Sequence, residues 1–302
     1  MQIESGRTAF VTGGGAGIGL AVARVLVDAG MNVAVADLSR AHLDEARASF
    51  EAASSRVRLI ELDVTDRDAW AAAVDEAEAA FGPIHLLYNN AGVNVIRDVN
   101  DACAEDFEWV MGVNYGGTVN GVLTLLPRMK AHGEVAHIVN TSSIAGIAAG
   151  PGAGVYAASK FAIRGFTDAL RCDLAPHGIA VSLVCPGTVA TRLYESEDHR
   201  QVRFQGAVDE RTQAVRLQGA ELFRQVLPQG MDPMIAAARI RAGIERDAFY
   251  IFTHPEVKPD VEESCAELMA AFTDDPIDPD QAQLEEGRRQ ARRDALSGKS
   301  GG

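Results

Sequence analysis

The sequence predicts one α/β domain in which parallel strands form a sheet covered by helices on both faces. Short apolar segments of strand length alternate with longer segments of helical spacing from Thr8 to about Phe252. This alternation is typical of parallel sheets whose strands are joined by right-handed helical crossovers. The chain has 302 residues, 47% of them hydrophobic, so it can bury one large core.

Charge and cysteine content limit the partners and the compartment. The formal net charge is −14 without any basic stripe, which argues against nucleic acid and anionic membranes and favours small molecules as partners. The N-terminus lacks a charged-then-apolar leader and no apolar segment approaches membrane length, so we predict a cytoplasmic protein without membrane contact. Because no Cys-x-x-Cys pair occurs, we expect neither disulfides nor a zinc site, and reduced, mostly buried cysteines; these are Cys103, Cys172, Cys185 and Cys265.

A glycine turn joins the first strand to the first helix. The apolar strand Thr8–Val11 is followed by Thr12-Gly-Gly-Gly-Ala-Gly-Ile-Gly19 and by a helix over Leu20–Ala29. Glycines let the backbone approach a pyrophosphate closely, and the helix N-terminus offers free N–H groups to the phosphates. Such turns also arise for steric reasons alone, but the position between strand and helix favours binding. The glycines expected to matter are Gly13, Gly17 and Gly19.

The next two strands both end in carboxylates. Asn32–Asp37 ends about 20 residues beyond the glycines, where an acidic residue can bind the ribose hydroxyls of adenosine. Asp37 could also cap the helix that begins near Arg40, and both roles can hold together. Val57–Leu62 precedes Asp63 and Val64, which could flank an adenine, although a simple cap is nearly as good an interpretation of Asp63.

The alternation continues through the middle of the chain. A helix is expected over Asp66–Phe81 and a strand over His85–Asn89. This strand runs into Asn90, Ala91 and Gly92, whose small side chains and amides suit close packing beside a cofactor. One long helix is predicted over Glu105–His132, where the polar Asn114 lies among apolar neighbours and should need buried partners.

The stretch richest in functional groups lies between a strand over Ala136–Asn140 and a helix over Val155–Ala175. Ser143 follows the strand end, where open α/β sheets place functional groups. Tyr156 and Lys160 are four residues apart on one helix face, where the ammonium can favour the phenolate and lower the pKa of the tyrosine. Tyr156 could then exchange a proton with a substrate hydroxyl that Ser143 holds. A bare Tyr-x3-Lys often occurs by chance, so the preceding motifs give the pair its weight.

The last third of the pattern contains an irregular insertion. A strand is expected over Ala180–Cys185, and Pro186-Gly187 ends it. The following residues 188–230 are charged and only partly helical. We expect this insertion to form a substrate lobe rather than a surface segment without function. A helix over Pro233–Glu245 and a strand over Ala248–Phe252 complete the domain. Residues 255–302 form an acidic extension that ends in an arginine-bearing helix. Basic residues near a helix C-terminus offset the helix dipole, so we assign no ligand to this cluster. The cluster consists of Arg288, Arg289, Arg292 and Arg293.

These motifs together resemble the short-chain dehydrogenase/reductase superfamily in order and spacing. The match comprises Thr12-Gly-x3-Gly17-Ile-Gly19, Asn89-Asn-Ala-Gly92, Asn114, Ser143, Tyr156-x3-Lys160 and Pro186-Gly187, and it covers roughly residues 7 to 252. The resemblance implies a Rossmann-type, doubly wound sheet of seven parallel strands, in one domain over residues 1–254. It also implies a homodimer or homotetramer built through the helices 105–132 and 155–175.

The resemblance further implies a role for each motif residue. Tyr156 is then the general acid/base, Lys160 binds the nicotinamide ribose, Ser143 orients the substrate oxygen, and Asn114 anchors a water-linked proton relay. No metal is required. The nicotinamide cofactor contacts implied or expected are Gly13, Gly17, Ile18, Gly19, Asp37, Asp63, Val64, Asn90, Ala91, Gly92, Tyr156, Lys160, Pro186, Gly187, Val189 and Thr191.

The cofactor is predicted to be NAD, because a 2′-phosphate beside Asp37 would place like charges together. Members that use NADP commonly carry a basic residue where this chain has Ala16 or Leu38, and only Arg40 is close enough to oppose this prediction. Oxidation of a secondary alcohol is the favoured direction. An NADP-dependent ketone reductase of biosynthesis is the alternative, and a non-catalytic nucleotide sensor is disfavoured by the complete set of catalytic residues.

The substrate is predicted to be bulky and apolar or aromatic, because residues 145–154 carry mostly small side chains that leave room. Val93, Val95, Ile96 and the lobe after Thr188 are expected to complete this pocket. Arg97 and Arg192 are the nearest candidates to bind a substrate carboxylate. The chain is also similar to members with extended C-termini that oxidise benzylic alcohols, including lignin-derived aryl ethers.

Overall fold

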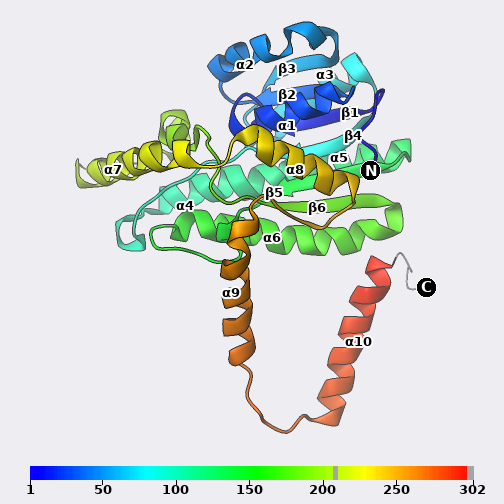
Figure 1. The fold of residues 1–302 in the computed structure, drawn as a ribbon, viewed down its shortest axis with the longest axis vertical. Helices are drawn as coiled ribbons and strands as arrows, with labels where there is room; N and C mark the ends of the chain where they lie inside the picture. The colour runs from blue at the N-terminus through cyan, green and yellow to red at the C-terminus, as the bar shows by residue number, and fades with distance from the viewer. Residues whose placement is uncertain (207–209, 298–302) are drawn as a thin grey trace.

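Seven parallel strands form the centre of the protein, in the order β3-β2-β1-β4-β5-β6-β7 (Figure 1). The computed structural model describes residues 1–206 and 210–297, and the side chains of residues 210–213 are left aside. The strands are β1 (Thr8–Thr12), β2 (Asn32–Asp37), β3 (Val57–Glu61), β4 (Ile84–Asn89), β5 (Ala136–Thr141), β6 (Ile179–Cys185) and β7 (Tyr250–Phe252). The predicted doubly wound parallel sheet is confirmed, and the order reverses direction between β1 and β4.

Helices cover both faces of the sheet because the strands are apolar on both sides. In β1, the side chain of Phe10 packs into one core cluster while Ala9 and Val11 pack into the other. The cluster with Ala9 and Val11 includes residues of α1 (Gly17–Asp28), α2 (Arg40–Arg47) and α8 (Pro233–Glu245). The opposite cluster includes residues of α3 (Arg67–Phe81), α4 (Ala104–Val110), α5 (Gly117–His132) and α6 (Gly154–Leu174).

The helix predicted as continuous over Glu105–His132 contains a π-helical segment. Residues Met111–Gly116 form this wider turn between α4 and α5. Gly117 follows it at a close approach to the loop after β3, where an added Cβ would lie 2.6 Å from Cγ2 of Val64. A π turn inside an α-helix commonly marks a functional position, and Asn114 lies within this one.

Two smaller expectations are corrected. The last strand begins at Tyr250 rather than Ala248. The cysteines are not mostly buried: Cys185 is buried, Cys103 and Cys172 are half-buried, and Cys265 is exposed. Cys265 is exposed because its helix projects from the body of the protein. No disulfide links the described residues, and all four thiols are free.

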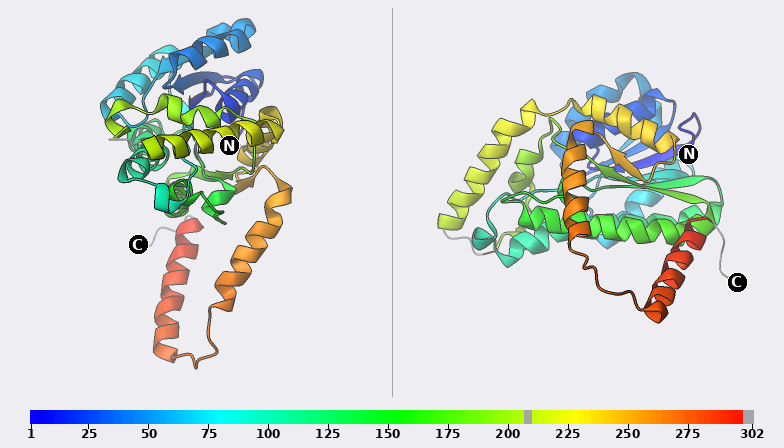
Figure 2. Two further views of the ribbon diagram at one scale, coloured as in Figure 1. Left: turned by 90° about the vertical axis from the view of Figure 1, so that its left-hand side faces the viewer. Right: turned by 60° about the horizontal axis from the view of Figure 1, so that its bottom comes forward.

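The expected lobe consists mainly of helical turns. It contains 3-10 turns at Leu193–His199, Val202–Phe204 and Leu227–Gln229, together with the helix α7 (Glu210–Val226). Beyond β7, the extension forms a hairpin of two helices, α9 (Lys258–Ala270) and α10 (Pro279–Leu296), which projects from one side of the body (Figures 1 and 2). Within the described chain, none of the helices has the length and apolarity that a membrane crossing requires.

Candidate active site

A cavity of about 450 Å³ opens at the carboxyl ends of the strands, beside the reversal between β1 and β4. This is where open α/β sheets bind their ligands, because the adjacent loops turn to opposite faces and leave a crevice. All of the predicted catalytic and cofactor-binding residues line this cavity except Gly19 and Asn114.

The glycine turn brings backbone, rather than side chains, to the cavity. Gly13 has φ +61°, and an added Cβ there would lie 2.8 Å from Cα of Ala91. At Gly19 an added Cβ would lie 2.0 Å from the carbonyl oxygen of Gly13. The N-cap residue of α1, Ala16, makes no side-chain capping hydrogen bond. The first N–H groups of α1 are therefore not capped by Ala16 and are suited to bind the phosphates of a dinucleotide.

Asn90 holds the glycine turn against the end of β4. Its backbone N–H donates to Oγ1 of Thr12 at 3.0 Å, and its side-chain amide donates to the carbonyls of Thr12 at 3.1 Å and Gly13 at 3.2 Å. The N–H of Ala91 donates to the same Thr12 hydroxyl at 3.1 Å. Asn90 lines the cavity, and these bonds show that it also positions the backbone expected to bind the cofactor.

Asp37 lies at the edge of the cavity with both carboxylate oxygens bonded to backbone. Oδ2 accepts from the N–H of Gly15 and Oδ1 from the N–H of Ser39, both at 2.9 Å. The suggested helix-cap role is wrong, because Ser39 is the N-cap of α2 and its hydroxyl accepts from the N–H of His42. Asp37 instead ties the glycine turn to the end of β2, with a fixed carboxylate facing the cavity.

The lobe reaches across the adenosine end of this cavity. Asp63 accepts hydrogen bonds from Thr65, from Gln201 and from Arg203, so it does not act as the cap of α3, which is Asp66. Val64 lines the same wall. The sequence pattern did not identify Gln201, because its partner lies 138 positions away in the chain.

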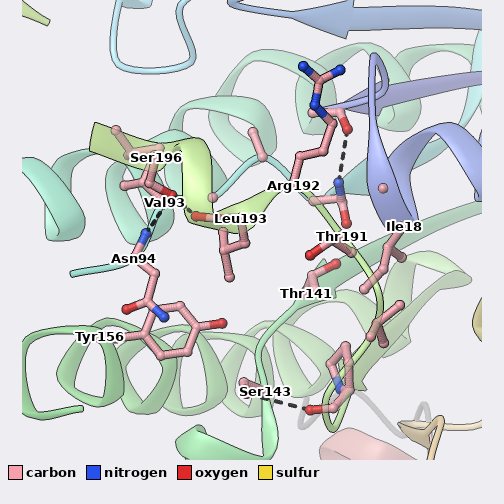
Figure 3. A pocket seen from close by; sticks show the side chains of 18 of the residues that line it. Ile18, Val93, Asn94, Thr141, Ser143, Tyr156, Thr191, Arg192, Leu193 and Ser196 are labelled. Atoms are coloured by element: carbon pink, nitrogen blue, oxygen red, sulfur yellow. Dashed lines mark hydrogen bonds between the residues drawn. The ribbon is translucent and has the colours of Figure 1, made fainter. Parts of the chain in front are cut away.

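Tyr156, Lys160 and Ser143 meet on the floor of the cavity, as predicted. Figure 3 shows the hydroxyl of Tyr156 pointing into the cavity on the side of Ser143. Nζ of Lys160 lies 5.3 Å from the centroid of the Tyr156 ring and donates to the carbonyl of Thr141 at 3.0 Å. The hydroxyl of Ser143 accepts from the N–H of Ala145 at 3.2 Å.

The expected lowering of the pKa of Tyr156 is not found. Burial raises the pKa of Tyr156 to about 12, although its hydrogen bond with Ser143 opposes the shift. Burial also lowers the pKa of Lys160 to about 8. Nζ of Lys160 donates to the carbonyl of Thr141, and burial is the dominant cause of the raised pKa of Tyr156. A tyrosine in this state carries its proton and can act as an acid.

Asn114 has the buried partners that its apolar surroundings require. Its Oδ1 accepts from the N–H of Val93 at 2.8 Å, and its Nδ2 donates to the carbonyl of Val93 at 3.0 Å and to Oγ of Ser159 at 2.9 Å. The side chain thus joins the π turn, the loop after β4 and helix α6. This arrangement positions Tyr156 and Lys160 relative to the loop, and the expected proton relay stays a prediction.

The turn after β6 is held by a histidine that the sequence pattern did not single out. Nδ1 of His254 accepts from the N–H of Gly187 at 3.1 Å, and Nε2 lies 2.9 Å from the carbonyl of Thr188. Pro186 and Val189 line the cavity beside them. Thr191 continues this wall opposite Gly17, where an added Cβ would lie 3.0 Å from its Cγ2.

The other end of the cavity is largely apolar and is closed by the lobe. Its predicted residues Val93 and Ile96 line it, whereas Val95 is buried and does not. Sequence reasoning missed the side chains that the lobe and the loop after β4 contribute, which are Asn94, Leu193, Ser196, Phe223 and Leu227. Figure 3 shows Asn94 and Leu193 on the walls of the same space as Tyr156.

The arginines expected to bind a carboxylate are bonded elsewhere. Arg97, only 1% exposed, pairs with Asp106 at 3.1 Å and with Glu197 at 2.9 Å. Arg200, 2% exposed, pairs with the same two carboxylates at 2.8 and 2.9 Å. This buried network fastens the lobe to α4. The expectation is therefore wrong for Arg97, because its charge is neutralised inside the protein.

Arg192 lines the cavity, but its guanidinium pairs with Glu45 of α2 at 2.6 Å and with Glu195 at 2.8 Å. The same contact brings together His42, Glu195 and His199, whose ligand atoms lie within 4.8 Å of one another. These three could hold a metal ion by their donor types, but the guanidinium of Arg192 already neutralises Glu195. The prediction that no metal is required stays a prediction.

The fold and the cavity define a class of nucleotide-binding oxidoreductase, and comparisons with known proteins identify the family. The family model for short chain dehydrogenases matches residues 7–202, and the chain belongs to the short-chain dehydrogenase/reductase family. It is similar to the C alpha-dehydrogenase of Sphingobium sp. strain SYK-6, with 33% identity over 91% of this chain and 90% of that protein.

Solved structures agree with this assignment. A short-chain dehydrogenase/reductase from Burkholderia phymatum in complex with NAD superposes with a TM-score of 0.83, at 33% identity over 92% of this chain and all of the other. A putative short-chain dehydrogenase from Novosphingobium aromaticivorans matches 98% of both chains, with a TM-score of 0.80 and 33% identity. The protein is thus an oxidoreductase of the short-chain dehydrogenase family that acts on small molecules and binds a nicotinamide cofactor.

Proposed function

We propose that the protein transfers hydride between NAD(H) and a secondary alcohol or its ketone, with Tyr156 as general acid/base. The observation that carries this proposal is the meeting of Tyr156, Ser143 and Lys160 on the floor of one cavity whose far end is apolar. A non-catalytic nucleotide sensor is disfavoured, because it would not need these three residues together in one cavity.

The residues of the chain supply proton transfer and orientation. Ser143 holds the substrate oxygen beside the hydroxyl of Tyr156, which donates its proton in ketone reduction and receives it in alcohol oxidation. NAD, when bound, accepts or returns the hydride. Lys160, which lies beside the ring of Tyr156 on the cavity floor, binds the ribose of the nicotinamide half. Asn114 ties helix α6, which carries Tyr156 and Lys160, to the loop after β4.

NAD rather than NADP is the proposed cofactor because a fixed carboxylate faces the place for the adenosine ribose. Asp37 is held by Gly15 and Ser39, so turning it away would break two hydrogen bonds. Arg40, the residue that opposed this prediction, pairs with Asp44 at 3.5 Å and does not line the cavity. A 2′-phosphate in this place would lie beside the Asp37 carboxylate, and such a juxtaposition of like charges costs several kcal/mol.

The test compares the two cofactors in wild type and in an Asp37→Ala/Leu38→Arg variant. We expect wild type to have at least tenfold higher kcat/KM with NAD, and the variant to shift that ratio toward NADP. An Arg40→Ala variant is the matched control and should leave the ratio within a few-fold. A wild type that prefers NADP would favour the alternative, a ketone reductase of biosynthesis.

A bulky, apolar or aromatic substrate is proposed from the far end of the cavity. Ile96, Leu193, Phe223 and Leu227 present apolar side chains there, and the similar Sphingobium protein is named a C alpha-dehydrogenase. Apolar burial contributes about 25 cal/mol per Å², so an aryl-substituted secondary alcohol should have a kcat/KM at least 100-fold above that of 2-propanol. Equal values for the two alcohols would contradict the proposal.

We also propose a cytoplasmic location and a homodimer or homotetramer. The sequence has a net charge of −14 and no basic stripe, which supports small molecules rather than nucleic acid as ligands.

Residues 188–230 act as the substrate lobe in this proposal, because Leu193, Ser196 and Phe223 from this segment line the cavity.

A further inference from the structure

A histidine just beyond β7 bonds the turn that follows β6. The backbone N–H of Gly187 donates to Nδ1 of His254 at 3.1 Å, and Nε2 of the same ring lies 2.9 Å from the carbonyl oxygen of Thr188. The hydroxyl oxygen of Thr253 lies 2.8 Å from Nδ1. One imidazole therefore joins two consecutive residues of the turn to the segment that follows the neighbouring strand.

The partners of His254 determine which of its nitrogens carries hydrogen. A backbone N–H can only donate, so Nδ1 must be an acceptor, and a carbonyl can only accept, so Nε2 must carry the hydrogen. The ring is therefore neutral, because an imidazolium would present N–H groups on both nitrogens. Only this form of the ring can bond Gly187 and Thr188 together.

The ring also packs closely on the turn. A Cβ added at Gly187 would lie 2.9 Å from Cγ and 3.1 Å from Nδ1 of His254, so the imidazole contacts the backbone directly. The position of the ring is itself supported from α8. Thr253 is fully buried, and its carbonyl accepts a hydrogen bond from Nη1 of Arg239. His254 is thus a fixed support on which the turn rests.

The turn lies at the end of the cavity where the catalytic groups meet. Residues 186–188 line the cavity. The carbonyl oxygen of Pro186 accepts from the N–H of Ile144 at 2.9 Å and lies 3.5 Å from Oγ of Ser143. Asp37, at the adenosine end, follows β2, which is separated from β6 by three strands of the sheet. A shift of the turn would therefore affect the nicotinamide half of the cofactor rather than the adenosine half.

We propose that His254 is a positioning residue for the nicotinamide half of the cofactor. Its neutral ring holds the backbone of Gly187 where the nicotinamide binds, given the proposed place of the cofactor, on which this role depends. His254 does not itself line the cavity, so it acts through the turn. The Pro186-Gly187 turn thus depends on a side chain 67 positions beyond Gly187.

The first experiment compares the affinities for NADH and for ADP-ribose, which lacks the nicotinamide, by isothermal titration calorimetry. His254→Phe keeps a ring beside the turn but removes the acceptor for Gly187. We expect the dissociation constant for NADH to rise about tenfold, while that for ADP-ribose stays within about twofold of wild type, because only the turn loses a hydrogen bond. A general loss of folding would weaken both ligands alike, so the difference between them reports on the turn.

His132→Phe is the matched control. Nδ1 of His132 also accepts from a backbone N–H, that of Glu134 at 3.0 Å, and its Nε2 lies 3.2 Å from the carbonyl oxygen of Ile84. His132 does not line the cavity, so both affinities should stay at their wild-type values. Equal changes for the two ligands in His254→Phe, or no change in either, would overturn the role of His254 and leave NAD binding in place. A wild type that binds neither ligand would instead contradict the proposed cofactor, and the role of His254 with it.

A second variant separates hydrogen bonding from packing. Asparagine carries an amide oxygen close to the position of Nδ1 in histidine, so His254→Asn keeps an acceptor for Gly187 but fills less space than phenylalanine. We expect its NADH affinity to remain within about threefold of wild type, well above that of His254→Phe. The reverse order of the two variants would show that the ring acts by packing alone and would overturn the proposed hydrogen-bonding role.

Discussion

The two ends of the cavity are built in different ways. The cofactor end consists of backbone and small side chains at strand ends, as at Gly13, Ala91 and Gly187, and residues close in sequence form each part of it. The substrate end is made of larger side chains from the loop after β4 and from the lobe, which a buried ionic network holds in place. The first end can be recognised from local motifs, whereas the second depends on contacts between distant segments.

Tyr156, where the two ends meet, should show the largest effect. Tyr156→Phe removes the group that transfers the proton and leaves the glycine turn and Asp37 intact. We expect kcat to fall by about 10²–10⁴-fold, while the dissociation constant for NAD changes only a few-fold. Single-turnover kinetics and fluorescence titration with NADH measure the two quantities. Retention of a tenth of wild-type turnover would contradict the role of Tyr156.

The substrate end should depend strongly on Asp106. Asp106→Asn leaves the buried guanidinium groups of Arg97 and Arg200 short of a carboxylate, and breaking a buried pair costs about 3–5 kcal/mol. We expect a lower midpoint in urea unfolding and higher KM for an aryl alcohol. Glu262→Gln is the control, because its pair with Lys258 is exposed and surface pairs contribute little. An unchanged midpoint for Asp106→Asn would show that the network does not stabilise the lobe.

The same network predicts a pH dependence. Burial would raise the pKa of Asp106, but hydrogen bonds from Arg200 and from the backbone of Cys103, with the charges of Arg97 and Arg200, hold it below its ordinary value. A lowered pKa in the folded protein stabilises it at pH values above about 4. This stabilisation is lost as the pH falls through the lowered value. Urea unfolding at a series of pH values should show the loss in wild type and much less of it in Asp106→Asn.

The cofactor end should be sensitive to a single methyl group. Gly19→Ala places a Cβ against the carbonyl of Gly13, so the turn that receives the pyrophosphate must shift. We expect NADH affinity to fall by about tenfold or more, equivalent to about 1.4 kcal/mol. Gly150→Ala is the control, because an added Cβ there meets nothing within 4 Å. Equal affinity in the two variants would show that the turn adapts.

The smallest effect is expected at Asn94, a polar side chain in the largely apolar substrate end. Its Oδ1 is buried without a hydrogen-bond partner in the described residues, so its amide is available to a polar group of the substrate. Asn94→Leu should lower kcat/KM about tenfold for aryl alcohols that carry a second hydroxyl. The same variant should leave kcat/KM for the aryl alcohol without that hydroxyl within a few-fold. Equal losses for both alcohols would exclude this contact.

The sequence by itself determined the sheet, the position of the cavity and most of its cofactor end. Alternating apolar segments specify a parallel sheet because its strands are buried on both faces, and Gly13, Tyr156 and Lys160 act through spacings of a few residues. Asn114 could be selected because a polar side chain in an apolar helix needs partners.

Only the tertiary structure decided how the remaining groups pair. Arg97 and Arg192 looked available to a substrate in the sequence, yet each pairs with protein carboxylates, of which Glu197 and Glu45 lie 100 and 147 positions away. The pKa of Tyr156 followed burial rather than the nearby ammonium of Lys160. Local spacing encodes which groups share a helix face or a turn, whereas burial and ion pairing depend on which distant segments the fold brings together.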